Sequence, residues 1–364
     1  MSVGIGIIGL VKSGRTTIFN ALTRGKADTK DLSPHIRIAK VPEPRLNVLA
    51  DMLHPKKVVP AEVRYIDIGA SVKGLVKDET IGGQLLNQLS NVDSLINVVR
   101  AFTDESIPHI EGSLDVDRDI ATMDLELTFS DLALLERRLE KIELSLKGAK
   151  QPERQGLLRE QGMLTKIKTE LENDVPIREL RLAPDEAKTI ANYQFLTAKP
   201  LLIVVNIGEE QLPEAISLEA ELNSHYSHPK RRIITLCGKL EMELAQLDDN
   251  SAAEEFRTEF GIRESGLDRT IRLSYELLGL ISFFTIVSAE VKVWSIQSGT
   301  NAVKAAGKIH SDMERGFIRA EVISYGDLVK CGSLAEARKR GVLQLEGKNY
   351  IVQDGDIITF LFNV

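Results

Sequence analysis

Hydrophobic positions along the chain form either short continuous runs or long periodic stretches. Continuous apolar runs occupy residues 3–8, 94–99 and 201–205, and they are typical of strands in a parallel sheet that is covered on both faces. Between the last two runs, residues 120–146 and 157–171 carry apolar side chains at helical spacing, with charges between them. The pattern predicts an α/β domain that is interrupted by a hairpin of two long amphipathic helices.

The remaining hydrophobic segments predict further strands. Residues 36–41 and 58–68 each indicate one strand, with a helix over 45–53 between them. From residue 281 on, β-rich runs alternate with Gly and Asp turns and with two short helical segments, which favours a compact α+β module. Residues 353–356, QDGD, predict a hairpin turn between the last two strands. We therefore expect three parts: 1–112 with 196–278, an inserted hairpin over 113–195, and a last domain over 279–364.

Composition narrows the class of protein. A chain of 364 residues with 43% hydrophobic residues is long enough for two or three domains with buried cores. It has no apolar run of about 18 residues, no basic-then-apolar leader, and two distant cysteines, Cys237 and Cys331, without metal-ligand spacing. We expect a cytoplasmic protein. The net charge of −7 argues against an extended basic surface but allows a local basic patch.

The first chemical signal is the stretch GLVKSGRTT at residues 9–17. A strand that enters a Gly-rich turn and then a helix places backbone N–H groups and the positive end of the helix dipole around one anion. The spacing fits G-x-x-x-x-G-K-[ST], with Arg15 in the place of the Lys. Arginine keeps the charge but is bulkier and bidentate, which favours phosphate binding over fast transfer chemistry. The candidate phosphate-binding residues are Gly9, Lys12, Ser13, Gly14, Arg15, Thr16 and Thr17.

A metal-binding carboxylate is expected at the end of the predicted strand 58–68. Asp67 lies where proteins with a phosphate-binding loop of this kind hold Mg²⁺ through water. Thr16 is the second candidate metal-facing residue. A lone Asp at the end of a strand can also cap a turn. The sequence continues as Ile68, Gly69 and Ala70, so the D-x-x-G pattern is broken. The polar stretch 24–34 has the composition of a switch loop, and its candidate metal-facing residues are Thr29, Asp31 and Ser33.

A second motif follows the strand 201–205. Residues 206–209 read NIGE where small GTPases carry N-K-x-D, so Asn206, Ile207 and Glu209 are the candidates for base contacts. Cys237 lies where such proteins place a loop behind the base. Because the Lys and the Asp that select guanine are both missing, the residues alone leave the base preference open.

The ordered motifs resemble the YchF/Obg-like ATPases, a branch of the translation-factor-related P-loop GTPases. The resemblance covers residues 3–364 and includes GLVKSGRTTIFNALT, KKVVPAEVRYIDIG, HIEGSLDVDRDI, AKPLLIVVNIGE, AAGKIHSDMERGFIRAEVISY and LEGKNYIVQDGDIITFLFNV. It implies a P-loop NTPase domain with an inserted α-helical coiled-coil hairpin, followed by an α+β, ubiquitin-like TGS domain.

The resemblance also carries functional expectations. It implies a preference for ATP over GTP, because N-x-x-E replaces N-K-x-D, with Mg²⁺ held by Thr16 and Asp67. It implies association with the ribosome or ribosomal RNA through the TGS and helical domains, without a membrane or a DNA sequence as partner. His109, in the HIEG segment, stands where the family carries a His proposed to assist hydrolysis.

Three departures from the family pattern separate the possible functions. The family's N-V-G-K-S-T and D-x-A-G are replaced by KSGRTT and DIGA, and the 24–34 loop is shorter and lacks the family's Phe-Cys-Thr-Ile segment. These changes favour slow or impaired turnover, so the chain is either a slow ATP-dependent switch or a non-catalytic ribosome or RNA adaptor. A metabolic kinase is disfavoured because no second substrate site is visible. The candidate cations for RNA phosphates are Lys239, Lys304, Lys308, Arg315 and Arg319.

Overall fold

The computed structural model describes residues 3–25, 27, 35–68, 87–226, 228–247, 255–258, 262 and 264–363. The chain divides into two compact units. The first contains Met1–Ala39 and Arg64–Leu267, and the second contains Lys40–Val63 and Asp268–Val364. The candidate switch residues Thr29, Asp31 and Ser33, and also Gly69 and Ala70, lie outside the described residues.

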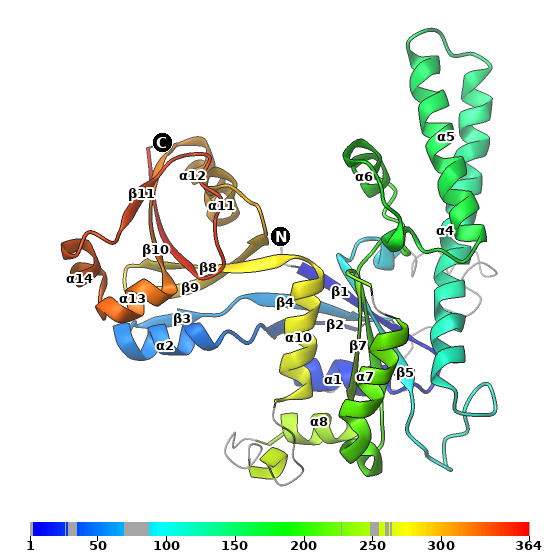
Figure 1. Ribbon diagram of the computed structural model, residues 1–364, viewed down its shortest axis with the longest axis horizontal. Helices are drawn as coiled ribbons and strands as arrows, with labels where there is room; N and C mark the ends of the chain where they lie inside the picture. The colour runs from blue at the N-terminus through cyan, green and yellow to red at the C-terminus, as the bar shows by residue number, and fades with distance from the viewer. Residues whose placement is uncertain are drawn as a thin grey trace. The chain divides into compact units, whose positions relative to one another are not determined.

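The first unit is built on a six-stranded sheet in the order β2-β4-β1-β5-β6-β7 (Figure 1). Strands β1, β5, β6 and β7 are parallel neighbours, and every residue of β5 and β6 is buried, as the continuous apolar runs predict. The bounds are β1 Val3–Gly9, β2 His35–Lys40, β4 Glu62–Asp67, β5 Ser94–Arg100, β6 Leu201–Asn206 and β7 Arg231–Leu236.

Helices cover this sheet and extend from it. They are α1 Arg15–Thr23, α4 Val116–Leu146, α5 Glu153–Glu172, α6 Pro184–Ala191, α7 Ala215–His225 and α8 Gly238–Ala245, with the short 3-10 helices η1 Ile177–Glu179 and η2 Glu209–Glu214. The first half of α4 packs on the sheet, because Ile120, Met123 and Leu127 join the same hydrophobic cluster as Leu95 and Ile203.

The second half of α4 forms the helical hairpin. It lies beside α5 (Figure 1), and a separate hydrophobic cluster joins the two helices through Leu135, Ile142, Leu164, Ile167 and Leu171. Both helices begin earlier than the apolar period predicts, because their first turns are charged and Asp115 caps α4 by accepting from the backbone N–H of Arg118. None of the helices in the described ranges is long and apolar enough to cross a membrane.

The second unit is an α+β domain around a sheet in the order β11-β10-β12-β8-β9-β3. Strands β8 and β9 form an antiparallel hairpin, and Phe283, Phe317 and Phe360 pack in the core beside α11. The strands are β3 Lys57–Val59, β8 Leu280–Val287, β9 Glu290–Gln297, β10 Phe317–Ser324, β11 Gln344–Glu346 and β12 Asp356–Phe362. The helices are α2 Pro44–Leu53, α10 Gly266–Leu277, α11 Ala302–Ile309, α12 Ser311–Arg315, α13 Tyr325–Cys331 and α14 Leu334–Lys339.

Two local expectations are wrong. The predicted single strand over 58–68 is two strands, β3 and β4, which belong to different sheets and are separated at Pro60, a residue without a backbone donor. The QDGD turn forms, since Asp356 N donates to Gln353 O at 3.2 Å, but it does not close a hairpin. Strand β10 lies between β11 and β12 and pairs with both.

Residues 40–63 were expected in the first domain but pack in the second unit. Strand β3 adds to the second sheet beside β9, in parallel register. Arg45 of α2 forms an ion pair with Asp354, with 2.7 Å between Nη1 and Oδ2. The local pattern of this segment could not indicate its partner, because both contacts join residues that are far apart in the chain.

A buried carboxylate ties the hairpin back to the sheet. Asp131 of α4 accepts hydrogen bonds from Leu196 N at 2.9 Å, Thr197 N at 2.7 Å and Thr197 Oγ1 at 2.7 Å. These residues lie just before β6, so Asp131 fixes where the chain re-enters the sheet. Burial raises the pKa of Asp131 to about 6.

This carboxylate predicts a pH-dependent difference between wild type and Asp131→Asn. The folded protein binds the Asp131 proton more tightly than the unfolded chain does, so ionisation between about pH 4 and about pH 7 lowers the free energy of unfolding of the wild type. The advantage of wild type over the variant should therefore shrink by about 2–3 kcal/mol across that range. Urea unfolding followed by circular dichroism measures it, and a difference that stays constant with pH contradicts the assignment.

Candidate functional site

The loop between β1 and α1 has the backbone of a phosphate cradle. Lys12 and Gly14 adopt positive φ values of 65° and 87°, and Ser13 N donates to Leu10 O at 3.2 Å. A Cβ at Gly9 would lie 2.5 Å from Val98 O, and one at Gly14 would lie 2.2 Å from Asn206 Nδ2. Both glycines are therefore required by close approach, and the loop delivers its N–H groups to the N-terminus of α1.

Asn206 holds this loop in place. At the end of β6 its Nδ2 donates to Ser13 O at 3.0 Å, and its Oδ1 accepts from Gly238 N at 2.9 Å. The residue is 4% exposed. A single amide thus joins the cradle to the first residue of α8, which places Asn206 in a positioning role within the described structure.

The other candidate base-side residues differ in exposure. The Ile207 side chain is buried in the sheet's hydrophobic cluster, and its N–H donates to Leu236 O at 3.0 Å. Cys237 is also buried, and burial raises the pKa of its thiol. Glu209 remains partly accessible and forms an ion pair with Lys239, with 3.1 Å between Oε1 and Nζ.

Arg15 and Thr16 both contact Asp67. Arg15 Nε donates to Oδ1 at 2.7 Å, and Thr16 Oγ1 donates to Oδ2 at 2.8 Å. Asp67 has no exposed side-chain surface, whereas the Arg15 side chain is 12% exposed. The structure brings Thr16 and Asp67 together, but it also compensates the carboxylate with a guanidinium.

This arrangement does not suit Mg²⁺ as it stands. Mg²⁺ takes oxygen ligands, usually one or two carboxylates together with water and phosphate oxygens. Here the single carboxylate, Asp67, already neutralises Arg15 and has a donor on each oxygen. Over the described ranges, no group of three or more His, Cys, Asp or Glu residues could hold a metal. The metal role of Thr16 and Asp67 stays a prediction.

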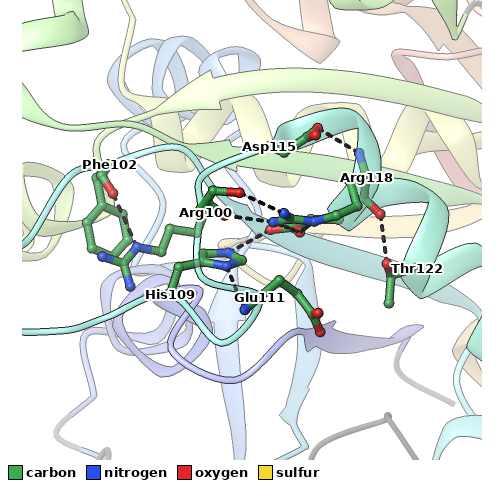
Figure 2. A network of polar contacts seen from close by, with 9 residues as sticks. Arg100, Phe102, His109, Glu111, Asp115, Arg118 and Thr122 are labelled. Atoms are coloured by element: carbon green, nitrogen blue, oxygen red, sulfur yellow. Dashed lines mark hydrogen bonds and ion pairs between the residues drawn. The ribbon is translucent and has the colours of Figure 1, made fainter.

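His109 lies in a polar network at the start of α4 (Figure 2). Its Nε2 is 2.8 Å from Asp119 Oδ2, and its Nδ1 accepts from Glu111 N at 3.1 Å. Since Nδ1 is an acceptor, the neutral imidazole carries its proton on Nε2 and donates it to Asp119. The His109 side chain is 5% exposed, so Asp119 holds it in a buried position.

A second pair of contacting residues, Arg100 and Phe102, lies closer to the cradle. A Cβ at Gly14 would lie 3.7 Å from the Phe102 ring, and the Arg100 guanidinium lies 4.4 Å from the centroid of that ring. Arg100 Nε also donates to Phe102 O at 3.2 Å. At the start of α4, Arg118 Nη2 is 2.8 Å from Asp119 Oδ1. The sequence reasoning missed Arg100, Phe102 and Asp119; the one available signal was a charged residue at the end of a buried strand.

Several other predicted contacts are already occupied. Lys304 pairs with Glu314 at 2.6 Å, and Arg315 pairs with Asp312.

A cavity of about 410 Å³ lies beside α6, where Lys199 Nζ donates to Ser90 O and Val92 O. That cavity is lined by none of the candidate site residues.

A sheet with the parallel strands β1, β5, β6 and β7, in which β1 ends in this cradle and Asn206 joins the cradle to the loop after β7, defines a P-loop NTPase fold. The chain belongs to the YchF family. It is 38% identical over 371 residues to "Ribosome-binding ATPase YchF" of Bacillus subtilis and 34% identical over 369 residues to the protein of that name from Escherichia coli O157:H7. Each alignment covers 100% of both chains.

Two further comparisons agree with this family. The structure of the Schizosaccharomyces pombe YchF GTPase is similar with a TM-score of 0.84 and 29% identity, covering 99% of this chain and 98% of that one. The family model YchF-GTPase_C, described as "Protein of unknown function (DUF933)", matches residues 280–363. The matched segment lies within the second unit.

The two hydrogen bonds of the Asn206 side chain lead to a prediction about the cradle. Asn206→Ala should lower the free energy of unfolding by about 1–3 kcal/mol, because Ser13 O and Gly238 N lose a buried partner. It should also speed amide hydrogen exchange in residues 10–16, measured by mass spectrometry.

Asn223→Ala is the matched control. Asn223 makes the same pair of amide bonds with Ile233 of β7, at 2.9 and 3.2 Å. It should cost comparable stability without changing exchange in the cradle. Equal rates of amide hydrogen exchange in the cradle of both variants would contradict the role of Asn206 in holding the cradle in place.

Proposed function

We propose that this chain binds a nucleoside triphosphate at the cradle, prefers ATP to GTP, hydrolyses it slowly and associates with the ribosome. The observation that carries the proposal is the geometry of the cradle, in which Gly9 and Gly14 are closely packed and Asn206 holds the loop through two hydrogen bonds. Full-length relatives that are named ribosome-binding ATPases support both the nucleotide and the partner. In this proposal Gly9, Lys12, Ser13 and Thr17 contribute to the phosphate side.

The proposed base preference rests on Glu209. An Asp at this place selects guanine in N-K-x-D proteins because its carboxylate accepts guanine N–H groups. Here the longer Glu209 side chain is paired with Lys239, so its carboxylate is partly compensated before any base arrives. Selection for guanine should be weak, and Asn206 would support the base through the loops that it joins.

The proposed slow turnover rests on two contacts. Arg15 is held by Asp67, and His109 is held by Asp119. If His109 assists hydrolysis, it does so after leaving Asp119, which lies in the first turns of α4. The hairpin then controls the rate, because the side chain that holds His109 back belongs to its first helix.

The alternative is a non-catalytic ribosome or RNA adaptor. The Arg15–Asp67 ion pair favours it, because Asp67 already neutralises the guanidinium that would otherwise face the phosphates. In either case the ribosome contacts would come from the hairpin and the TGS domain. Lys304 and Arg315 pair with carboxylates of their own domain, so phosphate contacts there require exchange of exposed ion pairs, which are weak.

Nucleotide binding is tested by titrating the purified chain with ATP or GTP in a calorimeter and by thermal unfolding. ATP at millimolar concentration should give heat and raise the unfolding midpoint, since a ligand of the native state stabilises it, and GTP should do so less. No heat and no shift with either nucleotide would overturn the nucleotide function. Cosedimentation with ribosomes that is independent of ATP, together with no hydrolysis, would favour the adaptor.

The His109 contact predicts a gain of activity. Asp119→Ala removes the acceptor that holds His109 and should raise ATP hydrolysis several-fold, while Asp119→Asn keeps an acceptor and should raise it less. Adding His109→Ala to Asp119→Ala should abolish the gain, because the two residues act through one contact. Asp117→Asn is the control, since Asp117 lies in the same first turn and pairs with Tyr226 instead. Equal rates for Asp119→Ala and the double variant would contradict the role of His109.

A further inference from the structure

We propose that Arg15 replaces a divalent cation as the counter-ion of Asp67, so that this chain binds a nucleoside triphosphate without needing Mg²⁺. The inference rests on the proposed nucleotide binding at the cradle and deepens it. Its basis is the mismatch between the expected metal residues and their contacts in the structure. Thr16 and Asp67 are in place, but the carboxylate is occupied by Arg15.

Burial favours the Arg15–Asp67 contact over a contact with a cation from solvent. Asp67 has no exposed side-chain surface, and its two oxygens accept from Arg15 and Thr16. A cation that binds this carboxylate directly therefore competes with Arg15 and Thr16 for its oxygens. Moving Arg15 would separate a buried carboxylate from the guanidinium that compensates its charge, which is unfavourable.

The positions of both residues are fixed by regular structure. Arg15 is the first residue of α1, and Asp67 is the last residue of β4. The helix begins with a hydrogen bond from Ile18 N to Gly14 O at 3.0 Å, and β4 lies beside β1 in the sheet. The ion pair is thus organised by the same strand–loop–helix unit that forms the cradle.

The chemistry of arginine suits this role. Its guanidinium stays charged at every physiological pH and carries five N–H donors in a planar fork, which matches both carboxylate and phosphate groups. One of these donors serves Asp67. By neutralising Asp67, Arg15 removes the repulsion that a bare carboxylate would exert on a triphosphate, which is a task that a divalent cation performs in other P-loop sites. A lysine has one compact ammonium group and lacks this fork.

The experiment compares ATP binding in excess Mg²⁺ and in EDTA by calorimetry, using the full chain. The wild type should change its Kd by less than about threefold between the two conditions, whereas Arg15→Lys should bind at least about tenfold more tightly with Mg²⁺. Arg231→Lys is the matched control. Arg231 forms an ion pair with Asp124, with 2.6 Å between Nη2 and Oδ2, and this pair is not part of the cradle. The Kd of the control variant for ATP should therefore depend on Mg²⁺ as little as that of the wild type.

Asp67→Asn tests the same idea with the opposite sign. If Asp67 mainly neutralises Arg15, the variant should bind ATP with Mg²⁺ at least as tightly as the wild type. If Asp67 instead holds a metal, the variant should lose about tenfold or more. Circular dichroism confirms its folding, and Mn²⁺ detected by electron paramagnetic resonance reports metal on the protein directly.

The outcomes separate this inference from the nucleotide function. A wild type whose ATP affinity falls about tenfold or more in EDTA overturns the counter-ion role and leaves nucleotide binding standing. The same holds for Asp67→Asn that is folded but about tenfold weaker with Mg²⁺. No heat with ATP in either condition, for any variant, overturns nucleotide binding and this inference together.

Discussion

The hydrogen bonds of one buried amide determine the geometry on which the candidate site depends. Asn206 satisfies a carbonyl of the cradle and an N–H at the start of α8. Because β1, β6 and β7 are parallel strands of one sheet, their carboxyl ends lie at the same edge, and a side chain at the end of β6 can reach the loops that follow the other two. Gly14 then becomes necessary, since Asn206 occupies the space that a side chain there would need.

Charge compensation is the second constraint on the site. Asp67, Asp119 and Asp131 are all buried, and each has at least two donors. Asp67 and Asp119 are compensated by arginines, whereas Asp131 has backbone and hydroxyl donors, and burial raises its pKa to about 6. A buried carboxylate without donors would be strongly unfavourable, so these partners stabilise the folded state. The site therefore satisfies its own charges before any ligand binds.

The sequence predicts the sheet and the hairpin because their signals are long and local. Continuous apolar runs mark β5 and β6, and helical spacing marks α4 and α5. The cradle is predictable for the same reason, since its glycines and its flanking elements are contiguous. The position of residues 40–63 is not, because β3 is only three residues long and pairs with β9, more than two hundred residues away. Nor can sequence show that Arg15 contacts Asp67, or His109 contacts Asp119, since side-chain direction is set by packing.

Two routes of contact start on α4, and one of them reaches the cradle through hydrogen bonds. In one, Asp119 binds His109 of the loop that precedes α4, and the same loop carries Phe102, whose ring would lie 3.7 Å from a Cβ at Gly14. In the other, Asp131 binds the N–H groups of Leu196 and Thr197, just before β6, and β6 ends at Asn206, which binds Ser13 O. A displacement of α4 relative to the sheet must therefore stretch or replace hydrogen bonds on both routes. Since α4 also forms half of the hairpin, the hydrogen bonds of the second route join the hairpin's first helix to the cradle.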